Sequence, residues 1–595
     1  MFTVSSNIQN FINRLLIWRL KHISDKYFIV FLSVIVGILA GLSAVLIKNT
    51  VHFIRYILDS NFFDKYQGTL LLVSPFVGIL IVTILLKYVI KKKAKPEIPN
   101  VLYAISRLEG KMNPSNIYTT IVASSLTVGF GGSVGLEGPS VTTGATVGST
   151  IAQLLRLNYK KTVLLIACAG AAAIASLFKA PITGVVFALE IFMLDLTMAS
   201  ILPLLISSAF GALTSYLFFG QDVIYDFQLI SKFNIREIPF YLLLGVLTGL
   251  FSWYFTTIQF QTKKIFKKFS SWVLQVVIGG IILGVLIFLM PSLFGEGYQT
   301  VNSCLQGNYS YLFEHSLFYD YRNNIYSVIL MFVALVIFKS IATAVTFGAG
   351  GVGGIFAPVL FLGANIGFLF SKVFETFGIR ITESNFALVG MAGVLSGVMY
   401  APLTGIFLIA EITNGYELIF PLMLVSTISF AINRSFNPHS IYTRKLAQEG
   451  NLITHNKDKT VLSLMKVDKL IETDFISVHA EDSLRKLVDA ISKSHRNIYP
   501  IVDSENNFKG IVFLDHIKHI IFKQELYDTM FVRDLSFHPQ AIVSPEETMK
   551  DVVRKFQLTG NYNIPVVKDG KYLGFISKAN VYLEYRKKLN YFSEE

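Results

Sequence analysis

Long apolar runs alternate with polar or glycine-rich breaks over the first three quarters of the chain. Most runs approach the roughly 17–25 residues that cross a bilayer as a helix. Others are short or broken by Gly, Pro or an acid. Such pieces suit half-spanning helices around a polar pathway, because irregular backbone at membrane depth persists only where protein or a cavity satisfies it. The long runs are residues 27–47, 70–90, 201–219, 241–258, 272–290 and 325–338, and the broken runs include 163–178, 181–192 and 407–420. The pattern predicts an all-α polytopic membrane domain.

Composition supports a membrane location. Of the 595 residues, 53% are hydrophobic and 15% are charged, and the mean hydropathy is +0.55, which excludes an ordinary soluble protein for most of the chain. The net charge of +13 does not indicate a nucleic-acid partner, because the basic residues form short clusters beside apolar runs, as in cytoplasmic loops. The two cysteines, Cys168 and Cys304, lie far apart, which argues against a disulfide framework or a cysteine metal site.

The N-terminal segment, residues 1–26, carries Arg14, Arg19, Lys21 and His22 among apolar residues and shows no signal-peptide cleavage pattern. These features favour a cytoplasmic or interfacial segment. We therefore expect a multi-pass protein of a plasma membrane, with its N-terminus and its C-terminal tail in the cytoplasm; an organellar membrane stays open.

The tail differs from the rest of the chain and repeats internally. Apolar composition ends near residue 447, residues 448–464 form a linker, and two similar stretches follow at 465–524 and 530–589. Each stretch combines an amphipathic helix with a short β-branched strand, a polar turn and a second strand. The tail is therefore predicted to be a tandem pair of small α/β domains.

The membrane part, residues 27–447, also contains a repeat. "FKAPITGVVFALEIF" and "MYAPLTGIFLIAEIT" share Ala-Pro-x-Thr-Gly and an acid nine residues after the proline, Glu190 and Glu411. "EGPSVTTGATVG" likewise pairs with "FAPVLFLGANIG". Two halves, roughly 27–220 and 238–447, with broken helices at matching positions indicate a transporter-like core with its site at the repeat interface.

Glu137 stands in the glycine-rich stretch "GFGGSVGLEGPS". The proline two residues later favours a helix start, whose free N–H groups and dipole attract negative charge. The acid is either a helix cap, which would stabilise the helix by up to about 1 kcal/mol, or part of an ion pathway, because acids inside a bilayer are costly and functional. In the other half, "GAGGVGGIFAP" has the same proline without an acid, so Ile355 and Phe356 would present free N–H groups to a small anion. Close helix packing is the alternative role for these glycines.

The ordered motifs "GSVGLEGP", "GGIFAP" and the two Ala-Pro-x-Thr-Gly segments resemble the CLC family of chloride channels and transporters, and the tail resembles a pair of CBS domains. The resemblance covers about residues 27–589. It implies the CLC fold of inverted repeats, a homodimer with one anion pathway per subunit, and conduction of chloride and similar anions without a required cofactor. It further implies a gating role for Glu137, and anion contacts from Gly138, Ile355, Phe356 and the hydroxyl of Tyr442. Without the resemblance, Tyr442 would be read as an interfacial anchor.

Three positions depart from the family pattern. In "KPEIP" the first anion-binding motif has Pro96 in place of a serine, followed by Ile98, which leaves the choice between chloride and nitrate open. Leu136 replaces the basic residue that usually precedes the gating glutamate. Ile191 follows Glu190 where proton-coupled members generally carry a second acid, the internal proton acceptor. This favours passive conduction, and Glu190 is expected to be structural, satisfied by neighbouring helix ends.

In the tail, Ser577 and Asn580 occupy the positions where CBS pairs bind adenine nucleotide, but neither repeat keeps the ribose-binding aspartate. A nucleotide site and a dimerising scaffold without nucleotide both stay open. For the whole chain we expect an anion channel, not an enzyme and without a metal site, gated by Glu137 and modulated by the tail. The alternative is a proton-coupled chloride or nitrate antiporter. A cation transporter and a non-conducting nucleotide sensor are less favoured, because apart from Glu137 the site offers neutral backbone and hydroxyl groups.

Overall fold

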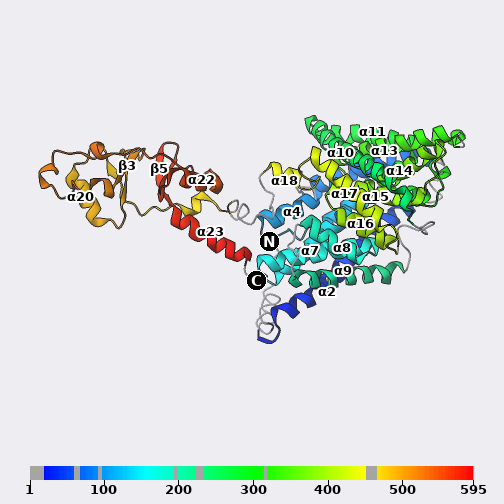
Figure 1. The fold of residues 1–595 in the computed structure, drawn as a ribbon, viewed down its shortest axis with the longest axis horizontal. Coiled ribbons are helices and arrows are strands. Elements are labelled where there is room, and N and C mark those ends of the chain that lie inside the picture. Colours follow the sequence, from blue (N-terminus) through cyan, green and yellow to red (C-terminus); the bar gives the residue numbers. More distant parts are fainter. Residues whose placement is uncertain are drawn as a thin grey trace. The chain divides into compact units, whose positions relative to one another are not determined.

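A computed structural model describes residues 19, 21–58, 67–91, 97–192, 198–220, 233–313, 316, 318–322, 324–413, 415–449, 462 and 465–593. The chain divides into two compact units, Met1–Leu452 and Ile453–Glu595. The first unit is helical and the second mixes helices with short strands (Figure 1). Each unit is described separately below.

The first unit is built from helices of very different lengths. Among the described residues, nine helices are long and apolar enough to cross a membrane. The helices are α2 (Asp25–Leu58), α3 (Gln67–Ile84) with the π-helical turn η2 (Leu85–Val89), α4 (Ile98–Arg107), α5 (Asn116–Gly129), α6 (Glu137–Leu154), α7 (Tyr159–Phe178), α8 (Pro181–Phe192), α9 (Met198–Phe219), α10 (Ile238–Lys268), α11 (Trp272–Leu289), α12 (Tyr298–Leu305), α13 (Ile325–Ala349), α14 (Phe356–Thr376), α15 (Glu383–Met399), α16 (Pro402–Ile412), α17 (Ile419–Phe436) and α18 (Arg444–Gln448).

Two of the predicted broken runs differ from the structure at their boundaries. The run 163–178 belongs to α7, a 20-residue helix long enough to span, because the Asn158 side chain accepts a hydrogen bond from the Lys161 N–H and starts the helix before the apolar stretch. The run 407–420 covers the end of α16 and the start of α17. Apolar periodicity therefore located these segments but not their ends, since polar first turns and short loops leave the hydropathy pattern almost unchanged.

The two membrane halves have the same local structure. The series α6, α7, α8 corresponds to α14, α15, α16 in the order of the helices along the chain. Lys179 and Tyr400, the residues before the two Ala-Pro pairs, both adopt the left-handed conformation, with φ of 55° and 62°. A left-handed residue ends a helix by reversing the chain, and the proline then starts the next one. The repeat seen in the sequence is thus a repeat of helix–turn–helix geometry.

Small residues bring the paired helices of each half into close contact. At Gly144 of α6, an added Cβ would lie 2.7 Å from the Ala169 carbonyl oxygen of α7. The matching Gly363 of α14 faces the backbone of α15 at Gly390 just as closely. No side chain fits at such separations, so these glycines let backbones pack directly, as is common between membrane helices. The α7 helix is almost entirely buried as a result.

The second unit contains two small sheets with helices. The first sheet has the order β1 (Val478–His479), β2 (Ile498–Val502), β3 (Phe508–Phe513), in which β1 runs parallel to β2 and β3 runs antiparallel to it; the second pairs β4 (Asn563–Lys568) with β5 (Lys571–Ser577). The accompanying helices are α20 (Leu484–Lys493), α21 (Leu514–Ile517), α22 (Met549–Thr559) and α23 (Lys578–Ser593), and 3₁₀ turns such as η7 (Val467–Leu470) connect them. The predicted helix and two-strand unit is present in both repeats.

A polar turn closes the first strand pair of this unit. The Asp503 carboxylate accepts hydrogen bonds from the backbone N–H groups of Glu505 and Asn507 and from the Asn507 side chain. These donors favour the charged form and lower the pKa of Asp503 to about 2. The turn therefore keeps its hydrogen bonds throughout the neutral and mildly acidic pH range.

Candidate anion pathway

The glycine-rich stretches of the two halves pair with each other. Gly135 and Gly354 exchange backbone hydrogen bonds of 2.8 and 2.7 Å as an antiparallel bridge. A Cβ on Gly138 would lie 3.0 Å from the Gly354 Cα atom, tighter than most real Cβ contacts. Because α6 begins at Glu137 and α14 at Phe356, the bridge places two helix N-termini side by side. The first N–H groups of a helix have no partner within that helix, and together with the helix dipoles they make this region attractive to anions.

Glu137 is the first residue of α6, and its side chain reaches toward the start of α14. It is 1% exposed. Its Oε2 atom accepts a hydrogen bond of 3.3 Å from the Ala357 N–H, and its Oε1 atom accepts one from the Tyr298 hydroxyl. The carboxylate thus lies at the N-terminus of the helix from the other half.

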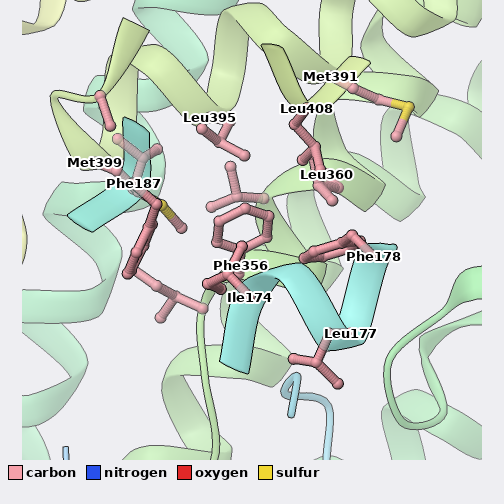
Figure 2. Close-up of a cluster of buried hydrophobic side chains, with 14 of the residues drawn as sticks. Ile174, Leu177, Phe178, Phe187, Phe356, Leu360, Met391, Leu395, Met399 and Leu408 are labelled. Atoms are coloured by element: carbon pink, nitrogen blue, oxygen red, sulfur yellow. The ribbon is translucent and has the colours of Figure 1, made fainter. Parts of the chain in front are cut away.

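The backbone at the start of α14 is held by a packed aromatic cluster. The Phe356 ring lies 5.3 Å from the Phe178 ring and 6.4 Å from the Phe187 ring, centroid to centroid. Figure 2 shows Phe356 in the middle of the surrounding apolar side chains, which include Ile174 and Leu360. Such packing fixes the Phe356 backbone. The N–H groups of the helix start therefore have a rigid support.

The structure describes three of the four remaining residues that were predicted to contact the anion. Ile355 immediately precedes α14 and is 7% exposed. Tyr442 lies between α17 and α18, is buried, and is near enough to Glu137 for an electrostatic interaction. Ile98 begins α4, is buried, and belongs to a helix that packs against α6 and α18. Pro96 lies outside the described residues.

Glu190 of α8 caps the start of α16, and Glu411 of α16 caps the start of α8. The Glu190 carboxylate accepts hydrogen bonds from the N–H groups of Leu403 and Thr404 at the start of α16, at 3.0 and 2.8 Å. The Glu411 carboxylate accepts equivalent bonds at the start of α8, from Ile182 at 2.9 Å and Thr183 at 2.7 Å. The expectation that helix ends satisfy Glu190 agrees with these contacts. The exchange joins the two halves through α8 and α16.

Removing either cap should destabilise the membrane unit. We expect Glu190→Ala to lower the free energy of unfolding by about 3 kcal/mol, because it leaves several N–H groups at the start of α16 without their charged acceptor. The measurement is the thermal unfolding midpoint in detergent. The matched control is Glu417→Ala, because Glu417 is exposed in the loop before α17. Equal midpoints for the two variants would contradict the capping role.

Ile191 is the next-to-last residue of α8, is 4% exposed and belongs to the apolar core. An apolar side chain thus lies in apolar surroundings, and an isoleucine cannot accept a proton.

Tyr298 and Glu296 are site residues that the sequence analysis missed. Tyr298 bonds Glu137 directly, and Glu296, two residues earlier, is buried and interacts electrostatically with Glu137. The available signal was "GEGY", a second acid between glycines in an apolar region. Like "GLEGP", this stretch places a glutamate among glycines. It has no counterpart in the other half, so a comparison of the two repeats does not reveal it.

In the second unit, Ser577 ends β5 and Asn580 lies in α23. The Ser577 hydroxyl donates a hydrogen bond to Glu472 and accepts one of 3.1 Å from the Asn580 N–H. Glu472 also pairs with Arg496 at 2.9 Å. The Ser577 hydroxyl, one of the two groups predicted for nucleotide binding, is thus already engaged by an acidic side chain.

Comparison with known proteins identifies the family. The family model for voltage gated chloride channels matches residues 77–434, and the model for the CBS domain matches residues 467–523 and 532–586. The chain therefore belongs to the CLC family of chloride channels and transporters and carries two CBS domains. It is a multi-pass integral membrane protein, and its family consists of anion channels and transporters, not enzymes.

Individual relatives agree with this family. The voltage-gated ClC-type chloride channel ClcB of Citrobacter koseri is 27% identical over 438 residues, covering 70% of this chain and 98% of the relative. A slow cyanobacterial Cl⁻/H⁺ antiporter has the same fold, with a TM-score of 0.59 and 21% identity over 71% of this chain and 97% of its own. A eukaryotic CLC transporter covers 94% of this chain and 99% of its own, with a TM-score of 0.60 and 16% identity.

Proposed function

We propose that this protein is a channel for chloride and similar small anions, gated by Glu137. The observation that carries the proposal is the position of the Glu137 carboxylate on the Ala357 N–H at the start of α14. A carboxylate is a tethered anion, so the donors that hold it would hold a free anion once it moves away. The neighbouring Ile355 and Phe356 backbone and the Tyr442 hydroxyl would supply further donors, a set that suits an anion and not a cation.

Passive conduction is favoured over proton-coupled exchange. Ile191 stands where an internal proton acceptor would be expected, and its apolar side chain is buried in the core. The names of the relatives point both ways, because the Citrobacter protein is a channel by name and the cyanobacterial one an antiporter. The alternative function is therefore a proton-coupled chloride or nitrate antiporter. Pro96 and Ile98 would bear on the choice of anion in either case.

The wider arrangement follows the family resemblance. We propose a homodimer with one pathway in each subunit, placed in a plasma membrane with the N-terminus and the CBS domains in the cytoplasm. The CBS pair would modulate conduction as a dimerising scaffold, since the Ser577 hydroxyl is engaged by Glu472. If adenine nucleotide binds the pair, Ser577 and Asn580 are the residues we would expect it to contact.

The proposed function is tested by anion flux from purified full-length protein in liposomes. We expect chloride efflux, measured with a chloride electrode after an ionophore relieves the membrane potential, well above that of protein-free liposomes. The control for nonspecific leak uses the same liposomes loaded with the potassium salt of a large impermeant anion, which should not be released. A protein that folds and inserts but releases no chloride, nitrate or fluoride would contradict the proposal and favour a non-conducting sensor.

A further inference from the structure

The gating carboxylate is held at both of its oxygens, and only one of the donors belongs to the helix start of α14. Ala357 of α14 donates to Oε2 of Glu137, while the hydroxyl of Tyr298, the first residue of α12, donates to Oε1. The carboxylate cannot leave the end of α14 without breaking the bond to Tyr298. A hydrogen bond to a charged group is among the stronger polar contacts in proteins, so this bond favours the position of Glu137 that blocks the site.

The segment before Tyr298 is anchored on two sides. Ser133, in the glycine-rich stretch that leads to Glu137, donates through its hydroxyl to the Leu293 carbonyl at 2.8 Å. The Gly295 N–H bonds the Gly131 carbonyl at 3.3 Å. From α13, the fully buried Lys339 donates through Nζ to the Gly295 carbonyl at 2.9 Å. The position of the Tyr298 hydroxyl is thus built into the fold.

Glu296 acts on the gate from the same segment but in the opposite sense. Its side chain is 9% exposed, its Oε2 atom lies 3.6 Å from Arg55 Nη2, and it interacts electrostatically with Glu137. Two like charges in a poorly solvated region repel each other. The charged and titratable groups that face the two carboxylates are Lys48 and Arg55 of α2, Lys339 of α13, Tyr298 of α12 and Tyr442 before α18.

We propose that Tyr298 and Glu296 are opposing positioning residues of the gate: the Tyr298 hydroxyl holds the Glu137 carboxylate in the blocking position, and the Glu296 carboxylate repels it from that position. This inference rests on the proposed gating role of Glu137. It assigns the balance between closed and open states to Glu296, which precedes α12, and to Tyr298, the first residue of α12.

The test measures chloride flux as a function of pH, set equal on both sides of the liposomes. Tyr298→Phe keeps the ring and removes the donor to Glu137. The ionised carboxylate is then less well held and takes a proton more readily, so half-maximal flux should move to higher pH by about one unit, the shift that corresponds to losing a hydrogen bond to a charged group. Glu296→Gln removes the repulsion, so half-maximal flux should move to lower pH.

Matched variants separate this inference from other effects. Tyr311→Phe also removes a tyrosine hydroxyl that bonds α12, at Gln299, but not Glu137, and should leave the pH profile unchanged. In a Glu137→Ala background, Tyr298→Phe should have no effect. The inference is wrong if Glu137→Ala abolishes the pH dependence of flux but Tyr298→Phe does not shift the pH of half-maximal flux. It is also wrong if Tyr298→Phe and Glu296→Gln shift that pH in the same direction. Neither result contradicts the gating role of Glu137. If Glu137→Ala itself changes nothing, the proposed function fails.

Discussion

Glu137→Ala protein is expected to conduct chloride at every pH at which the wild type closes. The wild-type carboxylate competes with the anion for the Ala357 N–H and leaves the site when it takes a proton. Because the protonated fraction of one carboxyl group changes by about tenfold per pH unit above its pKa, wild-type flux should fall by up to that factor per unit. Flux through Glu137→Ala should stay constant. Chloride efflux from liposomes across a pH series measures both.

Two further variants sharpen this result. Glu137→Gln resembles the protonated side chain in shape and lacks its charge, so it should also conduct without pH dependence, although the amide can still occupy the site and lower the flux. Glu417→Ala removes an exposed glutamate and should behave as wild type. A folded Glu137→Ala protein that releases no anion, or that keeps the wild-type pH profile, would contradict the gating role.

Current through the wild-type protein is expected to reverse at the chloride equilibrium potential whatever the proton gradient. Ile191 is apolar and buried in the core of the membrane unit, so protons that reach Glu137 have no acceptor at this position. A tenfold proton gradient stores about 1.4 kcal/mol per proton, which corresponds to about 60 mV. Because a chloride channel does not move protons, this gradient does not change its reversal potential. Voltage recordings from planar bilayers with a one-unit pH gradient and equal chloride measure the reversal potential directly.

The same bilayers supply the control for this prediction. A tenfold chloride gradient at equal pH should move the reversal potential by about 60 mV for a chloride-selective channel. Obligatory exchange would instead produce a shift of tens of millivolts with the proton gradient alone. That outcome would replace the channel by the antiporter and would require a proton route that bypasses Ile191.

Much of the architecture was accessible from local patterns. The apolar runs located most membrane helices, the shared Ala-Pro-x-Thr-Gly segments indicated two equivalent halves, and the alternating strands of the tail indicated a repeated α/β unit. The exact ends were less accessible. The α7 helix starts at Tyr159 because Asn158 caps it, and a single cap residue hardly alters the hydropathy on which the prediction rested.

The contacts within the site could not be predicted from the sequence, because they depend on which distant segments pack together. A glycine followed by an acid and a proline predicts a helix start that attracts negative charge, and Glu137 indeed begins α6. The sequence did not indicate that its carboxylate would bond Ala357, 220 residues away, or Tyr298, 161 residues away. The exchange of caps between Glu190 and Glu411 was equally inaccessible in its detail, although the need for helix-end partners was expected.

The order of residues alone was enough to predict that this chain lies in a membrane, that its two halves repeat, and that an acid stands at a helix start where an anion could bind. Hydropathy, turn residues and helix capping are properties of neighbouring residues, so they are encoded locally. The donors that hold this acid, in contrast, follow from how distant segments pack. The Gly135–Gly354 bridge brings the two helix starts together, and the anchored segment before α12 positions Tyr298, whose hydroxyl bonds the acid. Such contacts join residues far apart in the chain, and only the packed fold determines them.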